Sequence, residues 1–121
     1  MLPYQDTYNS ASAAFNAKNY TEASRYFSEI LSKEPGFIEA RAFRAYCYYF
    51  LKEYQSSKID IEYMLSSGKP APTLYNLYDL LGSNYYNLGN QEEACKNYKI
   101  AAGMGDKNGT SNYSKLCQQG K

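Results

Sequence analysis

With 121 residues, 13 basic and 12 acidic side chains, the chain is the size of one ordinary domain and carries almost no net charge. Nucleic acid and anionic membrane surfaces are therefore disfavoured as partners, because no long-range positive field is available to attract them. No apolar run reaches the roughly 18 residues of a membrane-spanning helix, so we expect no membrane insertion.

Residues 4–37 have the pattern of a helical hairpin. Small and apolar side chains recur at helical spacing in two successive stretches, as expected for two helices that pack side by side. Thr21 is the predicted N-cap of the second helix. Pro35 and Gly36 end that helix, because proline cannot continue it and glycine favours the turn.

Residues 38–71 are predicted to form a second hairpin of the same kind. Lys52 and Glu53 lie at the break between its two helices. The link to the next hairpin contains Pro70 and Pro72, which exclude a helix there. We expect this link to be a longer turn rather than a domain boundary, because the hairpin pattern resumes at once in phase.

Residues 75–108 form the third and most regular predicted hairpin. Gly89 is expected to end its first helix, because glycine tolerates the left-handed conformation that closes many helices. Asn90 and Glu93 form a predicted capping box at the start of the second helix. The hairpins repeat with a period of about 34 residues, which indicates an array of helical repeats.

A short capping helix is predicted over residues 110–119. Asn108 and Gly109 before it are typical of a turn. Thr110 or Ser111 can serve as its N-cap. A helix with one polar side would cover the apolar face that the last hairpin of a stack leaves exposed.

The small and aromatic residues of the three hairpins recur at equivalent places. In the third hairpin they are Tyr78, Leu81, Gly82, Tyr85, Ala94, Tyr98 and Ala101. This pattern resembles the tetratricopeptide repeat (TPR) family, although Arg41 stands where the family has an aromatic residue. The resemblance implies an all-α fold, a right-handed superhelical array of three hairpins plus a C-terminal capping helix (an α-solenoid). It implies a single TPR domain over residues 1–121.

By the same resemblance, a peptide or helix of a partner protein would lie in a concave groove made by the first helix of each hairpin. The helical period gives the residues predicted to line this groove: Tyr8, Asn9, Ser12, Phe43, Tyr46, Tyr49, Asn76, Asp79, Tyr86 and Asn87. Tyr8, Phe43 and Tyr46 are the predicted anchors. For Tyr49 and Tyr86, which lie beside the packing face, an interior position is equally compatible with the pattern.

One branch of the family grips the C-terminal carboxylate of heat-shock chaperones with lysine, asparagine and arginine side chains. The corresponding places here hold Tyr8, Ser12, Phe43, Asn76 and Leu80. Because the cations of this clamp are absent, we expect no chaperone cofactor activity of that kind.

Arg44 and Asp60 occupy places on the two helices of the second hairpin that similar repeats often fill with arginine and aspartate. The resemblance therefore predicts an ion pair. We interpret this pair mainly as a structural clasp between the helices, with a ligand anchor as the less favoured interpretation.

The three cysteines, Cys47, Cys95 and Cys117, are far apart and form no C-x-x-C pair. We therefore expect neither a disulfide framework nor a zinc site, but buried free thiols in a reducing compartment. This predicts a cytoplasmic protein, unless a leader has been removed. Histidine, the commonest general base and metal ligand, is absent. Asp79 and Glu39 form no recognisable catalytic set with the cysteines, so we expect no enzyme, no metal and no cofactor.

Two functions are compatible with these features. The leading hypothesis is a scaffold or adaptor that binds a peptide or helix of a partner protein in the concave aromatic groove. The alternative is a structural module that stacks on copies of itself or within a larger assembly and has no free peptide ligand. A homo-oligomer is compatible with both hypotheses.

Overall fold

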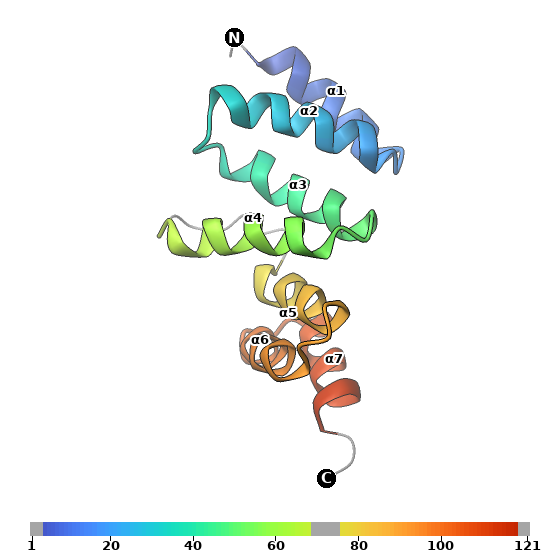
Figure 1. The fold of residues 1–121 in the computed structure, drawn as a ribbon, viewed down its shortest axis with the longest axis vertical. Helices are drawn as coiled ribbons and strands as arrows, with labels where there is room; N and C mark the ends of the chain where they lie inside the picture. Colours follow the sequence, from blue (N-terminus) through green and yellow to red (C-terminus); the bar gives the residue numbers. More distant parts are fainter. Residues whose placement is uncertain (1–3, 69–75, 119–121) are drawn as a thin grey trace. The chain divides into compact units, whose positions relative to one another are not determined.

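The chain folds into helices (Figure 1). The computed structural model describes residues 4–68 and 76–118, and within these two ranges it contains seven helices and no strand, which confirms the predicted all-α class. The helices are α1 (Gln5–Asn16), α2 (Tyr20–Lys33), α3 (Ile38–Phe50), α4 (Tyr54–Ser66), α5 (Leu77–Asn87), α6 (Gln91–Gly103) and α7 (Lys107–Cys117). None of the described helices has the length and apolar character needed to span a membrane.

The contacts divide the chain into two compact units, Met1–Pro72 and Thr73–Lys121. The first unit contains α1 to α4, and the second contains α5 to α7. The link with Pro70 and Pro72, which we predicted to be a longer turn, lies outside the described residues. Each unit is therefore considered by itself.

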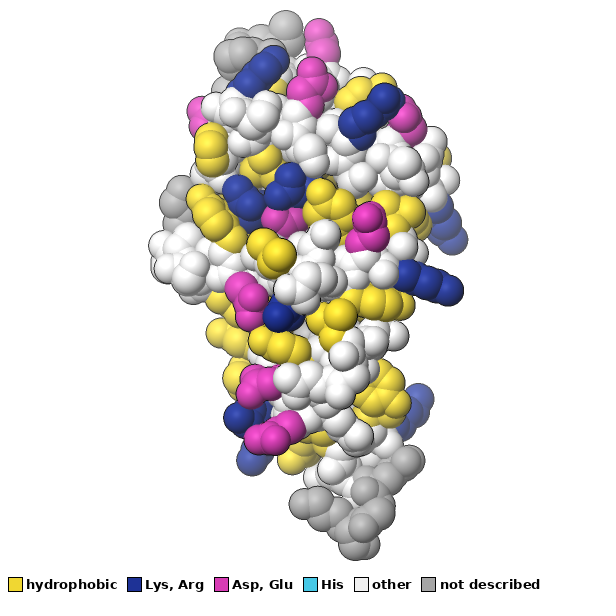
Figure 2. All heavy atoms as spheres, in the orientation of Figure 1, with side chains coloured by type: hydrophobic (Ala, Val, Ile, Leu, Met, Phe, Trp, Pro, Cys, Tyr) yellow, Lys and Arg dark blue, Asp and Glu magenta, His cyan; other side chains and the backbone are white. Residues whose placement is uncertain are grey.

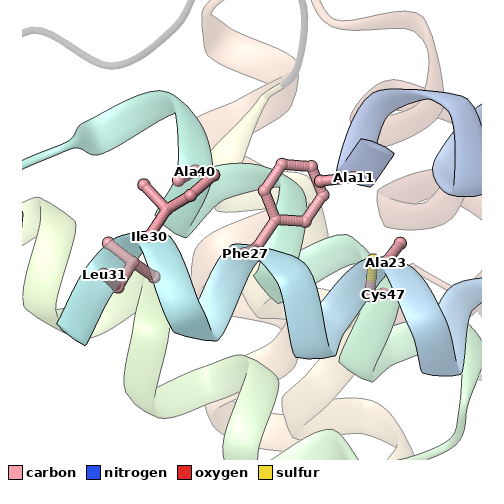
Figure 3. Packing of buried hydrophobic residues seen from close by; sticks show 7 residues of the cluster. All are labelled: Ala11, Ala23, Phe27, Ile30, Leu31, Ala40 and Cys47. Carbon is pink, nitrogen blue, oxygen red and sulfur yellow. The ribbon is translucent and has the colours of Figure 1, made fainter. Parts of the chain in front are cut away.

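In the first unit, each helix packs mainly on its neighbours in the sequence: α1 on α2, α2 on α3, and α3 on α4. Phe27 of α2 lies at the centre of its core and is completely buried. Its ring contacts those of Tyr8 and Phe43, and small residues elsewhere in the core let the helix backbones approach. Figure 3 shows the buried cluster, which consists of Ala11, Ala23, Phe27, Ile30, Leu31, Ala40 and Cys47.

Two turns in the first unit share one backbone geometry. Lys18 after α1 and Lys52 after α3 adopt left-handed conformations, with φ of 63° and 64°. The next amide then donates to a carbonyl in the last turn of the preceding helix, as from Asn19 N to Ala14 O at 2.8 Å. This geometry satisfies a carbonyl that the helix end would otherwise leave unpaired.

The same geometry recurs in the second unit with glycine in place of lysine. Gly89 ends α5, as predicted, and Gly105 follows α6, with φ of 86° and 83°. The amides of Asn90 and Asp106 make the equivalent hydrogen bonds at 2.9 and 3.1 Å. Lysine in this conformation has a steric cost that glycine lacks, because only lysine has a Cβ near the following carbonyl.

Two of the predicted caps differ in detail. Asn19, and not Thr21, caps α2, because its Oδ1 accepts from the amide of Glu22 at 3.4 Å. Asn90 caps α6 as predicted and accepts from the amide of Glu93 at 3.2 Å. In a complete capping box the Glu93 side chain would accept from the amide of Asn90. Here that amide donates to a carbonyl of α5 instead.

Helix α7 begins earlier than predicted, at Lys107 rather than near residue 110. Neither Thr110 nor Ser111 is its N-cap, because Asp106 Oδ2 accepts from the amide of Gly109 at 2.6 Å. Gly109 is therefore a helical residue and not part of a turn. The acidic cap before the first turn outweighs the turn preference of the Asn-Gly pair.

Two helical glycines allow close approach in the second unit, in which α5 packs on α6 and α6 on α7. A Cβ added at Gly82 would lie 2.7 Å from the Tyr98 ring of α6. A Cβ added at Gly109 would lie 2.5 Å from the Cβ of Ala101. Both glycines thus lack a side chain at a place where two helices meet.

A disulfide joins Cys95 of α6 to Cys117 of α7, with the two Cα atoms 5.6 Å apart. The prediction of three free thiols is therefore wrong for these two cysteines. They are 22 residues apart in the sequence and meet only because α7 folds back along α6. Cys47 alone is free and buried, as expected. The disulfide also removes the reason to expect a reducing compartment, because disulfides persist mainly where conditions are oxidising.

Candidate functional site

Aromatic side chains of the first unit form one connected series of ring contacts, which we call the aromatic network. Neighbouring ring centroids lie between 4.6 and 6.3 Å apart, within the range of favourable aromatic pairs. Its members are Tyr4, Tyr8, Phe15, Tyr20, Phe27, Phe37, Phe43, Tyr46, Tyr49, Phe50 and Tyr54. Four predicted groove residues, Tyr8, Phe43, Tyr46 and Tyr49, belong to it.

The inner part of the network is a packing feature. Phe43 of α3 stacks face to face on Phe27 of α2, with centroids 5.5 Å apart and an interplanar angle of 10°. Phe15 of α1 meets the Phe43 ring edge-on at 5.1 Å. Because Phe43 thereby connects three helices, we assign it to the packing between them rather than to the role of a partner anchor.

The outer part of the network lies at the C-terminal end of α3. Phe50 is 48% exposed, although its ring stacks on Tyr20 at 4.6 Å. The rings of Tyr46 and Tyr49 lie 6.3 and 5.7 Å from Phe50, and both side chains are half-buried. Tyr49 also contacts Tyr54 of α4 at 5.7 Å. These rings hold one another in position and still present apolar surface to solvent.

The predicted groove residues of α1 differ in exposure. Tyr8 is half-buried, and its ring lies 5.6 Å from Phe37 and 6.2 Å from Phe27. Burial, together with the negative charge of Glu39, raises the pKa of the Tyr8 hydroxyl, while a hydrogen bond with Ser12 lowers it. The hydroxyl therefore remains protonated at neutral pH. Asn9 is exposed, and its Oδ1 accepts from Gln5 Nε2 at 3.0 Å.

The remaining predicted groove residues, Asn76, Asp79, Tyr86 and Asn87, belong to the second unit. Asn76 Oδ1 caps α5 by accepting from two backbone amides at 3.0 and 3.1 Å. Asn87 Nδ2 donates to a carbonyl of the same helix at 2.8 Å. Asp79 accepts from Asn112 of α7 at 3.0 Å, whereas Tyr86 is 43% exposed. The three polar side chains thus already have partners within the chain.

The predicted ion pair between Arg44 and Asp60 is present. Arg44 Nη2 lies 2.6 Å from Asp60 Oδ1, and its Nε lies 2.8 Å from Oδ2, which gives a bidentate contact. Arg44 also donates to Ser28 Oγ of α2 at 3.1 Å. Burial opposes the charge of Arg44, but the hydrogen bond and charge of Asp60 raise its pKa above the ordinary value.

A second arginine, Arg41, also contacts Asp60, and this contact was not predicted from the sequence. Arg41 Nη1 lies 3.2 Å from Asp60 Oδ1, and its guanidinium carbon lies 3.8 Å from the centre of the Tyr63 ring. Arg41 also donates to Pro35 O at 3.0 Å. The sequence could have predicted this contact, because Arg41 precedes Arg44 by three residues and residues three apart share a helix face.

Asp60 is the centre of this cluster, with a side chain only 2% exposed. The contacts of its two arginine partners extend across α2, α3, α4 and the turn before α3. A buried ion pair adds little net stability relative to apolar residues, but loss of one partner leaves a buried charge unpaired. We therefore regard the cluster as a clasp of the first unit rather than as a ligand site.

Outside these features, exposed hydrophobic side chains occur in both units, among them Ile59, Leu88 and Met104. The face in Figure 2 shows hydrophobic side chains in several separate groups, between charged side chains of both signs. Within residues 4–68 and 76–118, no group of three cysteine, aspartate or glutamate side chains could hold a metal ion. No known protein-family model matches the sequence, and no curated protein matches it.

Proposed function

We propose that the protein is an interaction module of the TPR type, which binds an extended or helical segment of a partner protein through the outer part of the aromatic network. The observation that carries this proposal is the exposure of Phe50 beside the half-buried Tyr46 and Tyr49. Aromatic rings that are already held by neighbours lose little conformational entropy on binding, and they dominate protein interfaces energetically.

The repeat assignment in this proposal is supported by local geometry. The left-handed residues Lys18, Lys52 and Gly89 end the first helix of each predicted hairpin. In each hairpin a small, buried residue precedes this position by two helical turns: Ala11, Ala45 and Gly82. Helices that meet through such residues can approach closely, as stacking of repeats requires.

The partner surface is expected to be mainly apolar. The outer rings belong to α3 and its neighbours in a chain whose 13 basic and 12 acidic residues leave a net charge of +1. Without a strong field of one sign, association gains little from electrostatic steering. Binding should therefore depend weakly on salt concentration.

The test begins with affinity capture from the source cells and continues with the affinity of the isolated partner for variants. Phe50→Ala, and Tyr46→Ala separately, should each weaken binding by roughly thirtyfold, equivalent to about 2 kcal/mol. The matched control is Ile59→Ala, because Ile59 of α4 is 55% exposed but lies outside the aromatic network. This control should bind like the wild type.

Circular dichroism of each variant should show unchanged helicity, so that a loss of affinity reports the contact itself. Affinity that falls steeply with salt, or that survives the combined Tyr46→Ala and Phe50→Ala change, would sink the proposal. If light scattering shows that the chain binds only to itself, the structural alternative replaces it.

A further inference from the structure

Helix α7 has few buried residues, as does α1, which also buries only one. Gly109 is the single fully buried residue of α7, and Tyr113 and Leu116 are only half-buried. By contrast, α6 buries four residues against its neighbours: Ala94, Asn97, Tyr98 and Ala101. Because apolar burial is the main force that docks a helix, α7 is weakly held by packing alone.

Polar contacts add little to this docking. Asn112 Nδ2 donates to Asp79 Oδ1 of α5 at 3.0 Å, and Gln91 Nε2 of α6 donates to Leu116 O at 2.9 Å. These groups can bond to water when α7 leaves, so their net contribution is small. The disulfide to Cys95 is the strongest remaining connection.

The position of the disulfide determines which part of α7 it holds. The turn at Gly105 and the Asp106 cap fix the N-terminal end of α7 next to α6. Cys117 is the last residue of the helix, so the disulfide fixes the opposite end. Without it, the half of α7 beyond Gly109 would be held only by the contacts of Asn112, Tyr113 and Leu116.

We propose that the Cys95–Cys117 disulfide is a redox-sensitive latch, which keeps α7 docked on α6 and releases it when a dithiol reduces the bond. A thiolate of the dithiol attacks one sulfur, the S–S bond breaks, and the departing cysteine thiolate takes up a proton. The second thiol then attacks the mixed disulfide. Two cysteine thiols are formed, and the dithiol becomes a disulfide.

The exposure of the three cysteines is consistent with this latch. Both bonded cysteines are half-buried rather than buried, so a reductant can approach them from solvent. Cys47 is buried in the first unit, and burial raises the pKa of its thiol to about 12. Because thiolates carry out the exchange, Cys47 does not compete for either partner.

Hydrogen exchange measured by mass spectrometry tests the latch on the intact chain, oxidised or reduced with dithiothreitol. Amides in peptides from residues 110–117 should exchange roughly tenfold faster or more after reduction, because the loop closed by the disulfide no longer limits opening. Peptides from α2 provide an internal reference and should not change. Reoxidation with glutathione disulfide should restore slow exchange.

A variant series separates the latch from effects of the reagent. The double variant Cys95→Ser, Cys117→Ser should behave without dithiothreitol like the reduced wild type, whereas Cys47→Ala should keep the response. Equal exchange of α7 in both redox states would overturn the proposal, since packing alone would then hold the helix. Equal acceleration in α5, α6 and α7 would also overturn it, because the disulfide would then staple the whole unit.

Discussion

The two units hold similar helical hairpins together by different means. The first unit fills the space between helices with large aromatic rings and joins α3 to α4 through two arginines around Asp60. The second unit brings backbones together at Gly82 and Gly109 and adds the covalent bond from Cys95. Aromatic rings with ion pairs in one unit, and glycines with a disulfide in the other, are therefore alternative ways to hold neighbouring helices together. Each unit is consequently sensitive to a different kind of substitution.

The largest expected effect is on the clasp of the first unit. Asp60→Ala should lower the free energy of unfolding by about 3–5 kcal/mol, because it leaves two arginines without their carboxylate partner in a buried position. The side chains of Arg41 and Arg44 are only 11% and 18% exposed. Urea denaturation followed by circular dichroism measures this loss.

A double-mutant cycle makes this prediction sharper. The combined Arg44→Ala and Asp60→Ala change should cost less than the sum of the two single changes, since the two side chains interact directly. Arg44→Ala alone should cost less than Asp60→Ala, because Arg41 still pairs with the carboxylate. Strict additivity would contradict the observed ion pair.

The next largest effect on stability is expected at Gly82, where α5 lies close to Tyr98 of α6. Gly82→Ala should lower stability by about 1–2 kcal/mol, because the added Cβ would lie 2.7 Å from the Tyr98 ring. The matched control is Gly103→Ala, for which a Cβ meets nothing within 4 Å. It should be neutral or slightly stabilising, since alanine is the better helix former. Similar melting of both variants would argue against tight packing at Gly82.

The stability of the second unit is expected to depend on pH through the carboxyl group of Asp79. Burial raises its pKa, against a lowering by the hydrogen bond from Asn112. A carboxyl group with a raised folded pKa favours protonation in the folded state, so ionised Asp79 destabilises the fold above that pKa. The penalty disappears as the pH falls through the raised folded pKa towards the ordinary value of 3.8.

Asp79→Asn should therefore be more stable than the wild type at neutral pH, because asparagine can still accept from Asn112 without a charge. The difference in melting temperature between the two proteins should shrink on acidification. A difference that instead grows as the pH falls would mean that the ionised carboxylate stabilises the fold.

The smallest effect concerns the turns, where the units differ by lysine and glycine. Lys18→Gly and Lys52→Gly should each raise stability by about 0.5–1 kcal/mol, because glycine adopts the left-handed conformation without a Cβ clash. The reverse change Gly89→Lys should lower stability by a similar amount. Denaturant midpoints measure all three, and a loss of stability in Lys18→Gly would show that the lysine side chain makes a compensating contact.

Local signals in the sequence determined most of the helical pattern. Helical periodicity identified the helices, Gly89 marked the end of α5, and Asn90 marked the start of α6. These features depend on residues within one or two turns of each other, so they can be predicted without knowledge of the packing. The Arg44–Asp60 pair was also predicted, because the resemblance to the TPR family implies an arginine and an aspartate at these places on the two helices of one hairpin.

Tertiary structure alone decided the features that join one helix to another. Gly109 lies in α7 rather than in a turn, and there it packs against Ala101 of α6 without a side chain. Cys95 meets Cys117 because α7 returns along α6. Phe43 is a packing residue because rings from two other helices lie against it. In each case the outcome depends on a neighbour in another helix, and the spacing of residue types along one helix carries no information about that neighbour.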